Sequence, residues 1–269
     1  MVEGSDASMI NSKNVRDIIS KNEELLPQVH NYVEKIQNLG VAFRYTPIDA
    51  IKNYLAKHTN LIMFPSDELE YGGLVTYRDG RFYIHINTRQ PKTYENFIWA
   101  HEFYHFYFEA ELIKSSKINT FVDGRVPNES ERLANLFASE LLVNSILLKS
   151  LYKDLLQNYQ YDRLENHVIR LIEVFKLPYK CIVIKLAQDG LITVDDAVAI
   201  IDYKYQENLP TYFDQSILQP SNSIQFDSVG VLLEDATVKK NIRASDYESI
   251  NTLYSTHMSN FKMLRDKEE

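Results

Sequence analysis

The spacing of apolar residues changes between residues 61 and 88, and this change limits the folds that the chain can adopt. On either side of the segment, apolar residues recur at intervals of three and four, as one face of an α-helix requires. Within it they alternate with other residues, which is typical of strands. The pattern therefore predicts an α+β fold, in which one small sheet is followed by many helices.

Three strands are expected in the alternating segment, at residues 61–64, 73–77 and 82–87. The pair Asp79-Gly80 stands between the second and the third. Because this dipeptide suits a two-residue turn, it predicts that these two strands form a hairpin.

Helices are expected before and after this sheet. Pro27 is expected to break the first helical segment in two, because proline removes a backbone donor. Thr93 is expected to cap the helix that follows the sheet, and residues 208–228, rich in Pro, Ser and Asn, are predicted to form a loop or linker. The expected helices cover residues 13–38, 47–58, 93–112, 129–150, 161–175, 178–190 and 194–206.

The composition excludes some classes of protein. The chain is 45% hydrophobic, but no apolar run reaches the roughly 18 residues needed to span a bilayer. Its start is polar and acidic and lacks the features of a secretory signal, so a cytoplasmic protein without a membrane partner is expected. A net charge of −8 disfavours direct binding to nucleic acid through the phosphate backbone.

The string His101-Glu-Phe-Tyr-His105 is an H-E-x-x-H motif within a predicted helix. Residues four apart lie on the same helix face, so the two imidazoles can converge on one metal ion. Glu102 points to one side of the pair, where it can accept a proton from a water on the metal. Cys181 is the only cysteine, so a thiolate site is excluded and any metal must be held by histidines and carboxylates. The alternative is a pair of satisfied histidines on an aromatic-rich core helix.

A third ligand is needed, and the next long helix offers Glu129, Glu131 and Glu140. At about 100° per residue, Glu131 shares a face with the small residues Ala134 and Ala138, which allow another helix to approach closely. The other two glutamates lie on the opposite side. Glu131 is therefore the predicted ligand, while the alternative is a capping box that it forms with Asn128.

These motifs resemble the ImmA/IrrE family of zinc endopeptidases, which pair H-E-x-x-H with a downstream E-x-x-A-N-x-F-A-x-x-L-L. The corresponding residues here are Glu131-Arg-Leu-Ala134-Asn135-Leu-Phe137-Ala138-Ser-Glu-Leu141-Leu142. The resemblance covers residues 40–192 and departs from the family at Phe103-Tyr104, where Leu-Gly is usual.

The resemblance implies a zincin-like core with Zn²⁺ held by His101, His105 and Glu131, and with Glu102 as the general base. It also implies that the substrate is a protein, namely a helix-turn-helix transcriptional repressor of a phage or mobile element. Residues 1–39 are then an N-terminal helical extension, and residues 193–269 form a C-terminal accessory region.

Other features allow two interpretations each. The strand 82–87 either pairs with an extended substrate or is an ordinary internal strand. His85 either stabilises an oxyanion or is structural, and the structural role is favoured. Asn135 either orients a metal ligand or only makes a helix contact.

Residues 161–190 resemble a helix-turn-helix, but the second helix is too apolar to read base edges, so a packed helical pair is favoured. The alternative function for the whole chain is a non-catalytic regulator that uses the same scaffold to bind a repressor or DNA. An intact Glu102 favours the enzyme, since a purely structural metal site does not need it.

Overall fold

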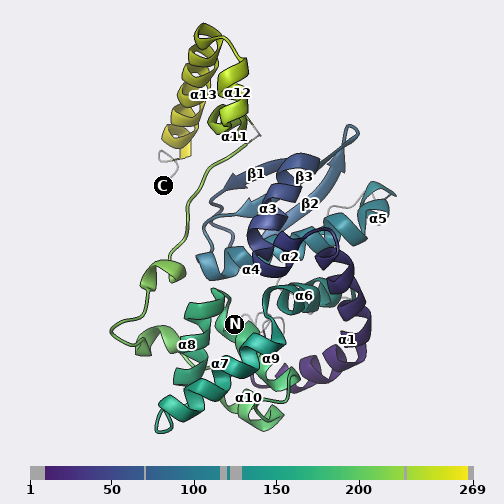
Figure 1. The fold of residues 1–269 in the computed structure, drawn as a ribbon, viewed down its shortest axis with the longest axis vertical. Coiled ribbons are helices and arrows are strands. Elements are labelled where there is room, and N and C mark those ends of the chain that lie inside the picture. The colour runs from purple at the N-terminus through teal and green to yellow at the C-terminus, as the bar shows by residue number, and fades with distance from the viewer. Residues whose placement is uncertain (1–9, 70, 116–119, 122–128, 227–228, 266–269) are drawn as a thin grey trace, which may run out of the picture.

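The computed structural model describes residues 10–69, 71–115, 120–121, 129–226 and 229–265. Figure 1 shows a mostly helical α+β fold, with α4 and α6 between a small sheet and the helices α7 to α10. The helices are α1 Val15–Gln37, α2 Val41–Tyr45, α3 Pro47–His58, α4 Lys92–Phe108, α5 Ala110–Ser115, α6 Glu129–Leu142, α7 Ser145–Asn158, α8 Leu164–Phe175, α9 Tyr179–Gln188, α10 Val194–Ile200, α11 Val229–Glu234, α12 Ala236–Asn241 and α13 Ala244–Arg265.

The sheet has the strand order β1-β3-β2-β4. Its strands are β1 Asn60–Phe64, β2 Gly73–Arg78, β3 Arg81–Asn87 and β4 Thr120–Phe121. β3 runs parallel to β1 and antiparallel to β2, and β4 pairs with the other side of β2. Of the two interpretations of this strand, the ordinary internal strand is confirmed, and pairing with an extended substrate is not possible because both edges of β3 are already paired.

The predicted hairpin between β2 and β3 is present. Asp79 and Gly80 have φ values of 50° and 79°, as a type I′ turn requires at its two central positions. The turn matches the right-handed twist of the strands, so this part of the sheet is determined locally.

Two hydrophobic cores meet along α1. The first core joins the sheet to α3, α4 and α6 and includes Val29 and Ile36 of α1; the second joins α7 to α10 and includes Val15 and Ile19. The expected break at Pro27 is wrong, since α1 is continuous through it. A proline inside a helix costs about 3 kcal/mol, and burial of apolar side chains on both sides of it offsets this cost.

Two helix boundaries also differ from the prediction. The helix expected over 129–150 is two helices, because Asn144 ends the first stretch and caps α7 by accepting a hydrogen bond from the amide of Leu147. Thr93 does not cap α4: that helix starts one residue earlier, and Thr93 is buried within its first turn. The predicted helix 47–58 is confirmed as α3.

The region 193–269 has two packed parts. In the first, Ala197, Ile200, Ile201, Phe213 and Ile217 are buried in the second core. Farther on, α11, α12 and α13 pack on one another and stand apart from the rest of the chain (Figure 1). The expected domain boundaries at residues 39 and 192 stay predictions.

Between these two places, residues 219–225 form a segment that we call the strap. Gln225 exchanges two backbone hydrogen bonds with Met63 of β1, of 2.6 and 2.8 Å. The hydroxyl of Ser221 donates to Glu95 of α4 at 2.6 Å. Of the expected loop or linker, this stretch is a loop. It is not a free linker, because its polar groups find partners on β1 and α4.

The helical pair expected at 161–190 is present as α8 and α9. Seven of the ten residues of α9 are buried, so this helix has few side chains to offer to the edges of bases. The packing favours a supporting role for the pair. Among the described helices, none is long and apolar enough to cross a membrane.

Candidate metal centre

The H-E-x-x-H motif lies in the middle of α4, where residues 98–105 are all buried. Neighbours such as Trp99 and Phe103 belong to the first core and hold the helix against the sheet and α6. His101 and His105 lie one turn apart, and their Nε2 atoms are 3.0 Å from each other. The two rings therefore point at the same place.

The first turn of α6 brings Glu131 to these rings. Its Oε2 is 3.2 Å from Nε2 of His101, and its Oε1 is 3.5 Å from Nε2 of His105. Ala134 and Ala138 are fully buried, as expected where two helices approach closely. Donor atoms held at about 2.0–2.1 Å by a tetrahedral zinc lie roughly 3.3–3.4 Å apart, so the observed separations suit one small cation.

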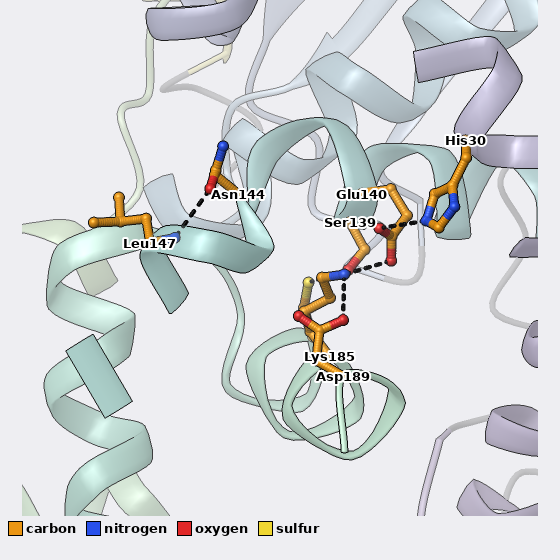
Figure 2. Close-up of polar contacts among 8 residues, drawn as sticks. His30, Ser139, Glu140, Asn144, Leu147, Lys185 and Asp189 are labelled. Carbon is orange, nitrogen blue, oxygen red and sulfur yellow. Dashed lines mark hydrogen bonds and ion pairs between the residues drawn. The ribbon is translucent and has the colours of Figure 1, made fainter. Parts of the chain in front are cut away.

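The other two candidate glutamates lie elsewhere. Glu129 is exposed at the start of α6. Figure 2 shows Glu140 next to Lys185 of α9, with an Oε1 to Nζ distance of 2.7 Å, and close to His30 of α1. The buried Lys185 also contacts Asp189, at 2.8 Å. Of the three candidates, only Glu131 faces the imidazoles; Asn128, its alternative partner, lies outside the described residues.

Each imidazole has a second partner at its Nδ1 atom. Nδ1 of His101 lies 3.0 Å from Oδ1 of Asn135, and Nδ1 of His105 lies 2.7 Å from Oε2 of Glu109. Both acceptors favour the tautomer with the proton on Nδ1, which leaves Nε2 free to bind a metal. Sequence reasoning considered Asn135 but missed Glu109, although its spacing of one helical turn from His105 was a usable signal.

The charges of the cluster are strongly coupled. Burial lowers the pKa of His101. Burial also opposes a charge on His105, but hydrogen bonds to Glu109 and Glu131 outweigh it and raise its pKa to about 10. Against its own burial, Glu131 is held at a pKa of about 2 by hydrogen bonds to both imidazoles. The site thus favours a protonated His105 next to the ionised carboxylate of Glu131.

Glu102 lies beside this cluster, against β2. A Cβ atom on Gly73 would come within 2.7 Å of its Oε1, so only glycine leaves room for this carboxylate. Oε1 is buried and has no hydrogen-bond partner in the described structure. Burial raises the pKa of Glu102 to about 8, and the nearby Glu131 adds to the effect. Sequence reasoning missed Gly73, although a glycine in a strand often marks a close approach.

His85 lies on the opposite face of the sheet. Its neighbours in β3, Ile84 and Ile86, belong to the first core under the sheet, and alternate residues of a strand point to opposite faces. His85 instead stacks on Phe64 and bonds to the hydroxyl of Tyr71. The structural role favoured by the sequence agrees with this placement.

One known family matches part of the chain. Residues 55–187 match the family model of peptidase M78, described as the IrrE N-terminal-like domain. This match agrees with the resemblance to the ImmA/IrrE family that the motifs carry. The IrrE-like segment contains the sheet, α4 and α6, and thus all four predicted site residues. No curated protein and no solved structure matches the chain.

The family implies a metallopeptidase-like scaffold and a bound metal. The residues of the IrrE-like segment fit such a metal, because two imidazoles and one carboxylate offer ligand atoms within 4.8 Å of one another. Glu102 lies beside this set and is not part of it.

Proposed function

We propose that the chain is a zinc-dependent endopeptidase with a zincin-like core. The observation that carries this proposal is the convergence of His101, His105 and Glu131 beside Glu102, whose buried Oε1 has no hydrogen-bond partner in the described structure. Two histidines, one carboxylate and an open position are typical of catalytic zinc sites, whereas structural sites have four protein ligands. A purely structural site would not need the buried glutamate.

The protein residues then have separate tasks. When bound, zinc supplies a Lewis acid that polarises the scissile carbonyl and acidifies a water molecule. Glu102 accepts the proton of this water and passes it to the leaving amine. Its pKa of about 8 in the metal-free site suits proton transfer near neutral pH, and a neighbouring cation shifts it towards the carboxylate form that a base requires.

The substrate backbone can reach this site along β2. The outer edge of β1 is bonded to the strap, and β3 is internal. β2 pairs with β4 at Leu74 and Val75, and Gly73, which touches Glu102, is the residue before them. An extended peptide that runs past Gly73 would therefore pass next to the base.

The resemblance to the ImmA/IrrE family extends the proposal to the substrate. It points to a helix-turn-helix transcriptional repressor of a phage or mobile element, which the enzyme cleaves in the cytoplasm. Because most of α9 is buried, this helix has few side chains to offer to bases, which supports the expectation that the chain does not itself bind DNA.

The test compares the wild type with Glu102→Gln. Purified wild type should hold about one zinc per chain, and the variant should keep its zinc, because Glu102 is not a proposed ligand. In cells that express either protein, mass spectrometry of labelled N-termini should find new termini only with the wild type. His101→Ala should lose both zinc and the new termini.

A general base is typically worth about 10²–10⁴ in rate, so the difference should be large. If the zinc-loaded Glu102→Gln protein produces the same termini as the wild type, Glu102 is not the base. If neither protein produces any while both deplete or bind the same partner, the chain is a binding module on a metallopeptidase scaffold.

A further inference from the structure

We propose that Glu109 is a positioning residue, which fixes the metal ligands His105 and Glu131 in their positions relative to each other. The inference rests on the proposed metal centre and adds a residue outside the H-E-x-x-H motif. Glu109 follows the last residue of α4, and its partners lie on both helices that form the site.

The two carboxylate oxygens of Glu109 are used separately. Oε2 accepts the hydrogen bond from Nδ1 of His105 at 2.7 Å, and Oε1 accepts one from the hydroxyl of Ser130 at 2.6 Å. Ser130 is the residue directly before Glu131 on the first turn of α6. A single carboxylate therefore connects one ligand on α4 to the neighbour of another ligand on α6.

The backbone of Glu109 is fixed as well. Its amide donates to the carbonyl of His105 at 3.1 Å, so side chain and main chain are both anchored to that ligand. The side chain is 14% exposed. A carboxylate held in this way keeps one orientation, which it can impose on the imidazole and on the hydroxyl.

The consequences for the metal follow from this geometry. An anionic acceptor at Nδ1 fixes the tautomer of His105 and makes its Nε2 a stronger donor to a metal than a neutral acceptor would. His101 has only the neutral amide of Asn135 in the same position. The two histidines are thus not equivalent, and loss of the Glu109 carboxylate should weaken the His105 side of the site.

The experiment measures zinc affinity by competition with a chelator for the full-length protein. Glu109→Gln keeps the size and an acceptor but removes the charge, and should lower the affinity by about 10–100-fold. The matched control is Glu111→Gln, whose carboxylate is 87% exposed and pairs with Lys114; its affinity should equal that of the wild type, as expected for a surface pair.

A second variant tests the bridge itself. Ser130→Ala should lower the affinity less than Glu109→Gln, and the double variant should bind no more weakly than Glu109→Gln alone, because Ser130 acts through Glu109. If the losses of zinc affinity in the two single variants add up in the double variant, Ser130 does not act through Glu109 and the inferred bridge is wrong. If Glu109→Gln is unstable, Ser130→Ala alone still tests the inference, because it should bind zinc more weakly than the Glu111→Gln control.

The visible absorption of the cobalt-substituted protein separates positioning from mere support of the fold. It should change in Glu109→Gln and stay the same in Glu111→Gln, because it reports the ligand geometry around the metal. If Glu109→Gln binds zinc as tightly as the wild type with an unchanged cobalt spectrum, the inference is overturned and the proposed function stands. A wild type that takes up no zinc overturns both.

Discussion

Replacing Gly73 by alanine tests whether β2 fixes the position of the catalytic carboxylate. The added Cβ would lie 2.7 Å from Oε1 of Glu102, 2.8 Å from its Cγ and 2.9 Å from its Cδ. Ordinary contacts between carbon atoms are about 3.5–4.0 Å. The Glu102 side chain must therefore move by about 1 Å, or β2 must move away from α4.

The cost should fall on activity more than on folding. The side chain is the mobile partner, so we expect a loss of about 1–3 kcal/mol in the free energy of unfolding, as for other overpacked sites. A misplacement of about 1 Å can reduce the rate about 10²-fold. The zinc content should not change, because none of the three proposed ligands lies among the atoms nearest to this Cβ.

The assay is kcat/KM for a peptide that spans a cleavage site found by N-terminal mapping, together with zinc per chain. Gly40→Ala is the control, since a Cβ there meets nothing within 4 Å, and it should behave as the wild type. A Gly73→Ala protein with full zinc and wild-type kcat/KM would refute the reasoning, because the carboxylate would then tolerate the displacement. Loss of zinc in this variant would also contradict it, since the clash would have reached the ligands.

Three further predictions follow from the same structure. Glu131→Ala should lose most zinc affinity in a chelator competition, whereas Glu129→Ala, at an exposed position, should not; equal losses would remove Glu131 as the ligand. Zinc uptake at pH 7 should release protons into a weakly buffered solution, and zinc affinity should rise with pH. The reason is that His105, with its pKa of about 10, is protonated in the metal-free protein and must be neutral to bind the metal. A zinc affinity that does not change with pH would show that His105 is not protonated there. A chain ending at residue 192 should lose at least about 4 kcal/mol of stability, because five buried residues of the second core (Ala197, Ile200, Ile201, Phe213 and Ile217) and the strap are removed. A chain ending at residue 226 should instead unfold at nearly the wild-type temperature, and equal stability of the two chains would contradict the packing.

Local pattern was enough to predict much of the fold. The two-residue period predicted the three main strands, and Asp79-Gly80 predicted the hairpin between β2 and β3. Both signals depend only on neighbouring residues. The spacing of His101 and His105 placed both imidazoles on one face for the same reason. Glu131 could be selected because the helical period puts it on the face of the small alanines.

Other features depended on residues far apart in the chain. Whether Pro27 breaks α1 is decided by packing against two cores, which a local propensity does not contain. The order of strands decides which edge is free, and periodicity alone cannot show that β3 is internal. The strap looked like a linker because its composition is polar, but its backbone groups are paired with β1.

The finer parts of the site show the same division. The sequence by itself determined which residue types could bind a metal and which of them share a helix face. Only the tertiary structure decided that Gly73 lies against Glu102 and that Glu109 reaches both His105 and Ser130. These contacts join elements whose approach is set by the packing of α4 between the sheet and α6, and such packing is a property of the whole chain.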